Sequence, residues 1–557
     1  MQLTGGEALA QQLVLEGASH VFGIPGVQLD WAVEALRKAE NAITYIVPRH
    51  EQATSYMADG FARTSGRPGV CMVVPGPGVL NAAAGLATAY ACSSPVLCIA
   101  GHIHSGGIGK GYGALHEIKE QSAVLAQVCK WQGIAQAPQQ VPGLIREAYR
   151  QMASGRPGPV AVEIPYNVLQ SRDEVELVEP DASEDLRLKP GEAQIKRIAA
   201  VLNGAERPVI YVGGGVLAAH ASAALDAFAR KLAAPVIMSE NGRGALSDRH
   251  PLAFSTLSGR ALLPHADMLV VVGSRFMETR GPFPAWNAGE MKYIYINADT
   301  DASREPRVPG MFVNADAGLA MAALAAELPA GRNSWLSEAR AAAIRAWAQA
   351  QIDAIEPQAS FVRALRAAIP DDGFFVNELT QTGYFARVAY PAYAPRTYIG
   401  PGYQGTLGYG FPTGLGIAVA NPDKVVVSIT GDGGFGWTLQ ELATAARYRL
   451  GHITVVFADG NFANVRGLQR EQFGKSYCAD LHNPDFVALA AAFGVPGTHV
   501  KDAAGLHGAL KDAIKAGGPH LIEVQVGEMP SPWGLLRLKA PGGLAGGGAA
   551  MPSPFVD

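Results

Sequence analysis

The chain has 557 residues, 48% of them hydrophobic, and carries 45 Lys and Arg against 49 Asp and Glu. This length and composition can bury several hydrophobic cores and indicate about three domains. The formal net charge of −4 argues against the basic surface of a nucleic-acid-binding or membrane-surface protein, and favours small neutral or anionic metabolites as ligands.

Cysteine usage and hydropathy point to the cytoplasm. The five cysteines are dispersed without CxxC spacing, which argues against a disulfide framework or a zinc site. The sequence has no uncharged apolar run of about 18 residues, the length that spans a membrane. It also begins with an amphipathic pattern instead of a signal peptide. We therefore expect a cytoplasmic protein.

The first third of the chain alternates helix-like stretches with short apolar runs. This alternation of helix-like and strand-like segments is typical of a parallel sheet covered by helices. Strands are predicted at residues 20–23, 44–47, 70–74, 95–100 and 159–164. The charged segment that follows, residues 171–190, is interpreted as an exposed linker, so the first domain is placed at residues 1–170.

A second α/β unit is predicted at residues 190–330. It begins with an apolar run that ends in three glycines, Gly213 to Gly215. Further strands are predicted at residues 234–238, 268–272 and 293–296. The alanine-rich stretch 334–355 contains no Gly or Pro and predicts a connecting helix.

A third α/β unit is predicted at residues 356–530. Its expected strands are residues 374–376, 425–430, 453–458 and 520–526. The tail, residues 531–557, is rich in Gly, Pro and Ala, a composition typical of a disordered end, although Trp533 and Leu535 leave an ordered flap open.

The most informative segment follows the apolar strand at 425–430. The strand ends in Gly431, Asp432, Gly433 and Gly434, and a helix is predicted at about 438–449. A glycine-rich turn between a strand and a helix presents backbone N–H groups to a phosphate. Asp432 adds a hard oxygen ligand for a metal ion on that phosphate.

A second acidic turn follows the next strand, where Asp459 precedes Gly460 and Asn461. The carboxyl ends of parallel strands share one sheet edge, so Asp432 and Asp459 could share a Mg²⁺ ion with diphosphate oxygens. Residues 431–436 also satisfy the GxGxxG dinucleotide pattern, but Asp432 would repel a pyrophosphate that lacks a bridging metal. A tight turn without any ligand is the remaining alternative.

These two turns resemble the thiamine diphosphate motif of the acetolactate synthase group. Other segments resemble that family in the same order: Pro-Arg-His-Glu-Gln-Ala-Thr from residue 48, Pro-Gly-Pro-Gly-Val-Leu-Asn from 75, Gly-Arg-Pro-Gly-Pro-Val from 155, Gln-Gly-Thr-Leu-Gly-Tyr-Gly-Phe-Pro from 404 and Gln-Glu-Leu from 440. The resemblance covers nearly the whole chain. It implies an α/β fold of three doubly wound parallel-sheet domains, which are pyrimidine-binding, central Rossmann-like and diphosphate-binding.

The resemblance implies roles for residues around the organic cofactor. Glu51 matches a glutamate that hydrogen-bonds the aminopyrimidine of a cofactor held by the partner subunit, although alone it reads as a surface residue at a strand end. Gly405 and Leu407 match positions that contact the pyrimidine through backbone groups, and the Leu407 side chain would hold the cofactor bent. Gln381 matches a diphosphate contact, whereas Thr382 replaces a frequent histidine.

The resemblance also implies the metal ligands. These are the side chains of Asp432 and Asp459 and the main-chain carbonyl of Asn461, with Asp459 standing where many relatives carry Asn. The adjacent glycines would contact the diphosphate: Gly431, Gly433 and Gly434. For the central domain, the resemblance leaves FAD, ADP and an empty site open, because a short glycine motif is a weak signal.

Three functions remain open at this stage. The leading one is an acetolactate-synthase-like carboligase, which decarboxylates a 2-keto acid such as pyruvate and adds the enamine to a second carbonyl. The alternatives are a plain 2-keto acid decarboxylase or 2-hydroxyacyl lyase, and a cofactor-free regulatory paralogue, against which Glu51, Leu407 and Asp432 speak. The resemblance implies a dimer or tetramer with active sites at the dimer interface, and no nucleic-acid or membrane partner.

The expected substrate pocket departs from the family. His116 stands at the position of a glutamine near the reacting carbonyl and Leu115 at that of a phenylalanine. A histidine there can exchange protons near neutral pH. Asn464 replaces a methionine, and Leu468 a tryptophan that favours 2-ketobutyrate as acceptor. We therefore predict a roomier pocket that tolerates a polar substrate, with the alternative that His116 and Asn464 face solvent or backbone.

Overall fold

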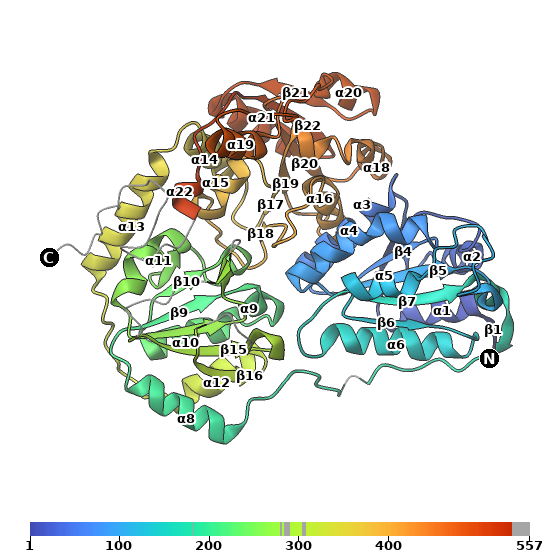
Figure 1. Cartoon of the computed structure of the whole chain (residues 1–557), viewed down its shortest axis with the longest axis horizontal. Coiled ribbons are helices and arrows are strands. Elements are labelled where there is room, and N and C mark those ends of the chain that lie inside the picture. The colour runs from blue at the N-terminus through green and yellow to red at the C-terminus, as the bar shows by residue number, and fades with distance from the viewer. Residues whose placement is uncertain (182, 279–280, 283–289, 304–307, 537–557) are drawn as a thin grey trace.

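The computed structural model describes residues 1–181, 183–278, 281–282, 290–303 and 308–536. It contains three six-stranded sheets, one after another along the chain, and every strand pair within them is parallel. Helices cover each sheet (Figure 1). The predicted fold class is therefore confirmed. Among the described residues, no helix combines the length and apolar character needed to cross a membrane.

The N-terminal sheet has the order β3-β2-β4-β5-β7-β6. Its strands are β2 (His20–Gly23), β3 (Thr44–Ile46), β4 (Gly69–Val73), β5 (Val96–His102), β6 (Trp131–Ile134) and β7 (Val160–Pro165). Its helices are α1 (Gly5–Leu15), α2 (Asp30–Lys38), α3 (Glu51–Ser65), α4 (Pro77–Cys92), α5 (Gln121–Val128), α6 (Gln140–Ala153) and α7 (Tyr166–Gln170). The central strands β4, β5 and β7 are fully buried, as expected of a parallel sheet covered on both faces.

The segment predicted as an exposed linker is attached to the N-terminal domain. Its strand β8 (Arg172–Glu174) pairs antiparallel with β1 (Gln2–Thr4). Farther along, the side chain of Gln12 hydrogen-bonds both backbone groups of Val178, with Nε2 to O at 2.7 Å and N to Oε1 at 2.9 Å. The segment is mostly exposed, as expected, but its first part is paired to the N-terminal domain through backbone and amide hydrogen bonds.

The central sheet has the order β11-β10-β9-β12-β15-β16. Its strands are β9 (Pro208–Val212), β10 (Val236–Met238), β11 (Ala253–Ser255), β12 (Met268–Val272), β15 (Lys292–Asn297) and β16 (Met311–Asn314), and a short hairpin joins β13 (Met277–Glu278) to β14 (Gly281–Pro282). The helices of this region are α8 (Glu192–Asn203), α9 (Gly214–Ala218), α10 (Ser222–Leu232), α11 (Thr256–Leu262) and α12 (Ala317–Glu327). The predicted connecting helix is α13 (Glu338–Asp353), capped by the side chain of Ser337.

The C-terminal sheet has the order β18-β17-β19-β20-β22-β21. Its strands are β17 (Phe374–Asn377), β18 (Tyr398–Ile399), β19 (Val426–Gly431), β20 (His452–Ala458), β21 (Gly497–Val500) and β22 (His520–Gln525). Its helices are α14 (Gln358–Ala368), α15 (Gln381–Ala389), α16 (Gly410–Ala420), α17 (Asp432–Phe435), α18 (Leu442–Tyr448), α19 (Ala463–Phe473), α20 (Phe486–Ala492), α21 (Ala503–Ala516) and α22 (Trp533–Leu536). The helix predicted at about 438–449 forms as a 3₁₀ turn followed by α18.

The start of the tail is ordered. Residues Trp533–Leu536 form α22, and Leu535 packs in the core of the C-terminal domain. The expectation of a disordered end is therefore wrong for residues 531–536, and the flap alternative holds there. The remaining tail residues, 537–557, lie outside the described part of the chain.

Helices α3 and α16 join the N-terminal and C-terminal domains. A side chain at Gly60 would put its Cβ 2.3 Å from the carbonyl oxygen of Thr413, and one at Gly416 would lie 2.1 Å from that of Met57. The two helices can therefore approach this closely only with glycine at the crossing.

Candidate active site

Asp432 holds two loops together at the carboxyl edge of the C-terminal sheet. It is 3% exposed and is the first residue of α17, directly after β19. Its Oδ1 accepts from the N–H of Gly433 at 2.8 Å, and its Oδ2 accepts from Gly460 N at 2.7 Å and from Asn483 Nδ2 at 2.7 Å. Asn483 was not predicted as a site residue, because nothing in its own segment indicates a contact with Asp432.

Asp459 lies in the loop after β20, next to the Asp432 contact. Its Oδ2 accepts from Gln381 Nε2 at 2.6 Å, and its Oδ1 accepts from the N–H of Asn461 at 2.9 Å. Burial, followed by the negative charge of Asp432, raises the pKa of Asp459 to about 6. The structure thus brings together four of the sequence-predicted residues, and the two neighbouring carboxyl groups form an oxygen-rich site suited to a hard divalent cation.

Glycines in the 431–434 turn are needed for packing. A Cβ on Gly433 would lie 2.6 Å from the ring of Phe462, and one on Gly434 would lie 1.9 Å from Oε1 of Glu378. At Gly431 the nearest atom would be 3.5 Å away, so that position has ordinary space. The turn therefore keeps its backbone close to neighbouring side chains at two of the three glycines.

Glu378 is a buried carboxyl group that sequence analysis did not identify. It follows β17 and accepts hydrogen bonds from Gly408 N at 3.0 Å and Gly410 N at 2.7 Å. Burial raises the pKa of Glu378 to about 7. Because it also touches Gly434, this side chain connects the 405–410 loop to the Asp432 turn. The only sequence signal was an acidic residue directly after a buried strand.

The loop expected to contact the pyrimidine has two left-handed glycines. Gly405 has φ of +58° and Gly408 has φ of +79°, conformations that favour glycine. Between them, the side chain of Leu407 is 36% exposed. Leu407 therefore stands at the protein surface in the single chain.

Glu51 begins α3 in the N-terminal domain, directly after its N-cap His50. Its Oε2 accepts from Nδ2 of Asn81 on α4 at 3.0 Å. Among the described residues, no hydrogen bond or ion pair joins Glu51 to Asp432 or Asp459. Within one chain, the structure places Glu51 and the pair of Asp432 and Asp459 on different domains.

Leu115 and His116 lie in the same domain as Glu51 and are both held by Gln28. Nε2 of Gln28 donates to the carbonyl oxygen of Leu115 at 3.0 Å, and its Oε1 lies 3.1 Å from Nδ1 of His116. The Leu115 side chain is 61% exposed. The half-buried ring of His116 thus meets a side-chain amide, and its predicted role at the substrate stays a prediction.

Asn464, on α19, contacts the ordered start of the tail. Its Oδ1 accepts from Nε1 of Trp533 at 2.8 Å, and its Nδ2 donates to the hydroxyl of Tyr384 at 3.3 Å. The rings of Trp533 and Tyr384 have centroids 5.0 Å apart. Leu468 is half-buried on the same helix. The polar ends of Asn464 thus already have protein partners, so its predicted role in substrate recognition stays a prediction.

The central glycine motif has a packing explanation. A Cβ on Gly213 would lie 2.4 Å from the carbonyl oxygen of Gly273, and one on Gly215 would lie 2.6 Å from the Cα of Gly273. These glycines allow the turns after β9 and β12 to touch. The motif therefore does not by itself favour FAD over ADP or an empty site.

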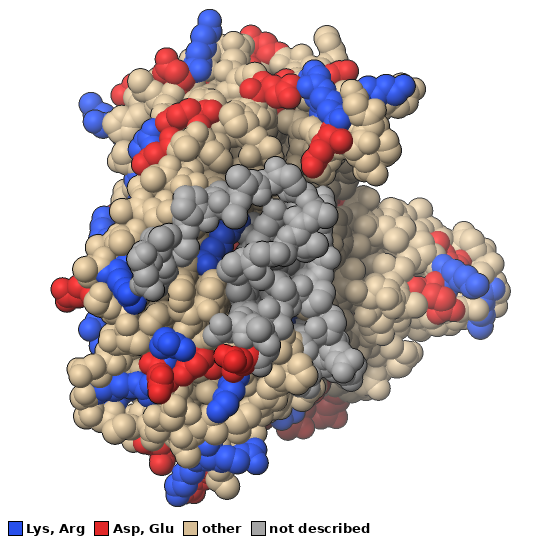
Figure 2. Space-filling view, turned by 60° about the vertical axis from the view of Figure 1, so that its left-hand side comes forward, with Lys and Arg blue, Asp and Glu red and all other residues tan. Residues whose placement is uncertain are grey.

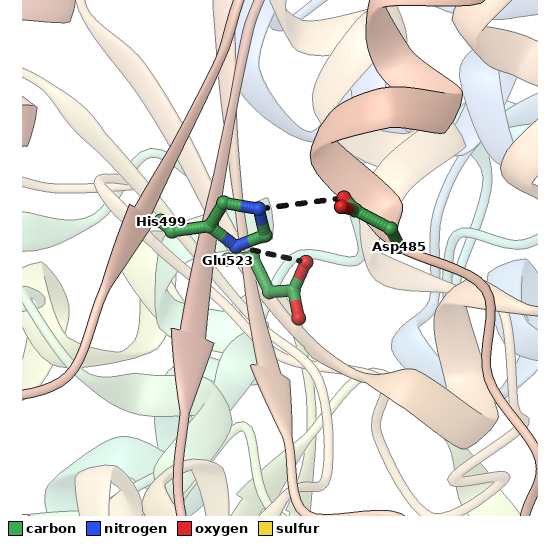
Figure 3. A group of neighbouring side chains, drawn as sticks. All are labelled: Asp485, His499 and Glu523. Atoms are coloured by element: carbon green, nitrogen blue, oxygen red, sulfur yellow. Dashed lines mark ion pairs between the residues drawn. The ribbon is translucent and has the colours of Figure 1, made fainter.

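A second group of ionisable side chains lies at β21, β22 and α20 (Figure 3). Nε2 of His499 is 3.4 Å from Oδ1 of Asp485, and its Nδ1 is 3.5 Å from Oε2 of Glu523. One ligand atom from each of the three side chains lies within 4.8 Å of the other two, but exposed acidic groups are common without a metal ion. Asp485 also caps α20 by accepting from Ala488 N. We interpret this group as a structural ion-pair cluster.

On the face shown in Figure 2, basic and acidic side chains are interspersed and do not gather by sign. This distribution agrees with the small formal net charge of −4.

Comparison with known proteins identifies the family. Residues 3–124 match the model "Thiamine pyrophosphate enzyme, N-terminal TPP binding domain", residues 195–324 match the central domain, and residues 380–524 match the C-terminal TPP binding domain. The chain is 36% identical over 546 residues to the probable 2-ketoarginine decarboxylase of Pseudomonas aeruginosa, covering 94% of each protein.

Two further relatives carry a different name. The chain is 31% identical over 575 residues to the probable acetolactate synthase large subunit of Methanocaldococcus jannaschii, covering 97% of this chain and 94% of the relative. It is 30% identical over 536 residues to the acetolactate synthase isozyme 1 large subunit of Escherichia coli, covering 94% of each. With all three domains matched and such coverage, the chain belongs to the thiamine pyrophosphate enzymes.

Proposed function

We propose that this chain decarboxylates a 2-keto acid with thiamine diphosphate and Mg²⁺. The observation that carries the proposal is the pair of Asp432 and Asp459 at the carboxyl edge of the sheet, where Gly460, the residue after Asp459, donates its N–H to Asp432. The names of the relatives, which specify acetolactate synthesis or 2-ketoarginine decarboxylation, support a 2-keto acid as substrate. When bound, thiamine diphosphate supplies the electron sink for the charge left after CO₂ departs.

The donor set fits a divalent cation. Asp432 and Asp459 would provide carboxylate oxygens and Asn461 its main-chain carbonyl, the hard ligands that Mg²⁺ prefers. A bridging cation would offset the repulsion between two carboxylates of which one is 3% exposed. The glycines Gly431, Gly433 and Gly434 and the amide of Gln381 would contact the diphosphate. FAD remains a proposal for the central domain, and ADP or an empty site are its alternatives.

Glu51 would position and hold a proton at the pyrimidine ring. Its Oε2 is held by Asn81, whereas its Oε1 has no hydrogen-bond partner among the described residues. A carboxylate with one anchored and one available oxygen is suited to a directed hydrogen bond. Gly405 and Leu407 would complete the pyrimidine contact.

The fate of the decarboxylated substrate separates two candidate activities. Carboligation, as named in the acetolactate synthases, requires addition to a second carbonyl, for which Leu115, Asn464 and Leu468 are the proposed pocket residues. Release of an aldehyde requires protonation instead. The decarboxylase is favoured by one observation, which is that the imidazole of His116, a group with both a donor and an acceptor nitrogen, lies beside Gln28 at the proposed pocket.

We also propose that the site forms between two copies of the chain, in a dimer or tetramer. Leu115 and Leu407 are exposed in the single chain, as are Val27, Leu80 and Tyr112. Large apolar side chains that are exposed in the segments of the candidate site are typical of a surface that a partner covers. The proposed location is cytoplasmic.

Product analysis tests the proposal. The purified protein, with thiamine diphosphate and Mg²⁺, is incubated with a panel of 2-keto acids, alone and with aldehyde or 2-keto acid acceptors, and products are identified by mass spectrometry. A ligated hydroxyketone supports the carboligase, and an aldehyde supports the decarboxylase. Absence of CO₂ release from every 2-keto acid, while the cofactor is bound, would refute both. Glu51→Gln serves as the inactive control, and the absorption spectrum of acid-released ligand reports any flavin.

A further inference from the structure

Gln28 is a buried amide whose two ends are both occupied. It lies in the loop after β2 and is 5% exposed. Its Nε2 donates to the carbonyl oxygen of Leu115 at 3.0 Å, and its Oε1 lies 3.1 Å from Nδ1 of His116. The side chain therefore contacts two successive residues of the proposed pocket with two chemically different atoms.

These contacts fix the orientation of the amide. If the amide were reversed, Oε1 of Gln28 would face the carbonyl oxygen of Leu115, and two acceptors would meet without a hydrogen between them. The carbonyl of Leu115 thus requires the NH₂ group on its side. Consequently the oxygen of the amide faces the ring of His116.

The orientation of the amide in turn fixes the tautomer of the ring. An amide oxygen only accepts hydrogen bonds, so Nδ1 of His116 must carry the hydrogen. In the neutral ring Nε2 then has a free lone pair. Nε2 has no hydrogen-bond partner within the described part of the chain, so a substrate group can reach it without displacing a protein contact.

The backbone at His116 is also fixed in an uncommon conformation. Its φ is +66°, a left-handed value that few residues other than glycine adopt. The carbonyl oxygen of His116 packs so closely on Gly76 that a Cβ there would lie 2.2 Å away. Gly76 is itself held by Gln121, whose buried Oε1 accepts from its N–H at 2.9 Å. The surroundings therefore impose both the backbone and the ring position.

This segment lies next to the proposed pyrimidine contact. Gly76 is the N-cap of α4, and Asn81, in the first turns of the same helix, donates to Glu51. The backbone of His116 and the carboxylate of Glu51 therefore both lie at the N-terminal end of α4. A proton acceptor at His116 would stand on the same edge of the N-terminal domain as Glu51.

We propose that Gln28 is a positioning residue that holds His116 in its Nδ1–H tautomer and thereby makes Nε2 the proton acceptor of the pocket. The inference rests on the proposed function. When Nε2 takes a proton from a substrate or water O–H group, the oxygen keeps the electron pair and the ring becomes an imidazolium. Nδ1–H continues to donate to Gln28 in both states, so the ring can take up and return a proton without turning.

The tautomer can be measured without turnover. The protein is labelled with ring-¹⁵N histidine, and the resonances of His116 are identified by their loss in His116→Gln. Neutral His116 is expected to show a hydrogen-bearing Nδ1 and a bare Nε2. In Gln28→Met, which removes both hydrogen bonds at similar size, this preference should be lost. Gln28→Glu loses only the hydrogen bond to Leu115 and should keep the preference, because a carboxylate oxygen also accepts from Nδ1–H. A wild-type ring with its hydrogen on Nε2 would overturn the proposal.

Kinetics provide the second readout. Gln28→Met should lower kcat on the order of 10- to 100-fold with little change in KM, and Gln28→Glu should recover part of the loss. Gln12→Met is the matched control, because Gln12 on α1 is also buried and its amide also donates through Nε2 and accepts through Oε1. It should leave the tautomer and kcat unchanged.

The outcomes separate the inference from the proposed function. A fall in kcat for Gln28→Met with an unchanged tautomer would assign Gln28 a merely structural role and overturn the inference. A protein that releases CO₂ from no 2-keto acid would refute the proposed function, whereas the tautomer result would still decide whether Gln28 orients His116.

Discussion

Asn81 donates from Nδ2 to Oε2 of Glu51 over 3.0 Å, and this bond joins the first turns of α4 and α3. It uses one carboxylate oxygen of Glu51 and leaves the other without a partner among the described residues. The acid is thus held in place by a neutral amide, which does not compete for a proton as a second charged group would.

Glu51→Gln should preserve the fold and cofactor binding but slow removal of the proton at C2 of bound thiamine diphosphate. The amide still accepts from Asn81, yet it cannot exchange a proton, and loss of a positioned proton-transfer group costs on the order of 10² to 10⁴ in rate. Quenched deuterium exchange at C2, followed by NMR, measures this rate. Asn81→Ala should have a milder effect, and exchange near the wild-type rate in Glu51→Gln would refute the role of Glu51.

Asp432→Ala should abolish Mg²⁺-dependent retention of thiamine diphosphate, because the diphosphate would face Asp459 without its bridging cation. Asp459→Asn should be much milder, since an amide oxygen can still coordinate. Isothermal titration with and without Mg²⁺ measures both. Asp485→Ala is the matched control, because Asp485 belongs to the ion-pair cluster of the same domain and should leave binding unchanged. Wild-type affinity in Asp432→Ala would place the metal elsewhere.

A site shared between two chains predicts complementation. Glu51→Gln and Asp432→Ala damage different domains, and no described contact joins the two residues within one chain. Mixed dimers would contain one site with both residues intact, so subunit exchange should restore up to about a quarter to a half of wild-type activity, depending on how subunits redistribute. Native mass spectrometry verifies the heterodimers. Verified heterodimers without recovered activity would show that each site lies within one chain.

The strands best predicted from sequence are those that are buried on both faces. Residues 268–272 form a continuous apolar run and match β12 in full, because a central parallel strand needs no polar face. The edge strands β6, β11, β16, β18 and β21 were missed. They are short or only partly buried, and β6 carries Gln132 and Gly133 between its apolar ends, so alternation is not visible there.

Some residues of the candidate site could also be predicted from the sequence, and others could not. Asp432 and Asp459 could be predicted because each follows a recognisable strand and the chemistry is local to its turn. Glu378, Asn483 and Gln28 could not, because each acts on a segment distant in sequence and its own neighbours carry no motif. Only the packing of the sheet edge brings these partners together.

The side chain of Asn464 should stabilise α22, the ordered start of the C-terminal tail. Asn464→Met removes the acceptor of Trp533 Nε1 and the donor to Tyr384, and a hydrogen bond of this kind contributes about 0.5 to 1.5 kcal/mol. Faster amide hydrogen exchange across α22 is expected, with Val465→Met as the exposed neighbouring control. If Asn464 instead recognises a polar substrate, the ratio of kcat/KM for that substrate over pyruvate should fall by the equivalent of about 1 to 3 kcal/mol. Unchanged kinetics with faster exchange would restrict Asn464 to the structural role.

His452 should make the C-terminal domain sensitive to mild acid. It begins β20, is buried, and its ring stacks on Phe411 with centroids 5.6 Å apart. Burial lowers its pKa from 6.5 to about 3. Between pH 3 and pH 6.5, His452 binds a proton in the unfolded chain but not in the folded chain. Protonation therefore favours unfolding, so the free energy of unfolding is highest above about pH 6.5 and falls as the pH decreases.

The size of this effect follows from linkage. Between pH 7.5 and pH 5 the free energy of unfolding should fall by about 2 kcal/mol because of His452 alone. His452→Gln removes this titration and is expected to be less stable than the wild type at pH 7.5. On acidification, the backbone amides of β19 and β20 should nevertheless lose less protection from exchange in this variant than in the wild type. Native-state hydrogen exchange with mass spectrometry, corrected for the intrinsic pH dependence of exchange, measures the difference. His499→Gln, which alters an exposed histidine of the same domain, is the control and should keep the full wild-type pH dependence. An equal loss of protection in wild type and His452→Gln would show that His452 does not resist protonation in the folded protein.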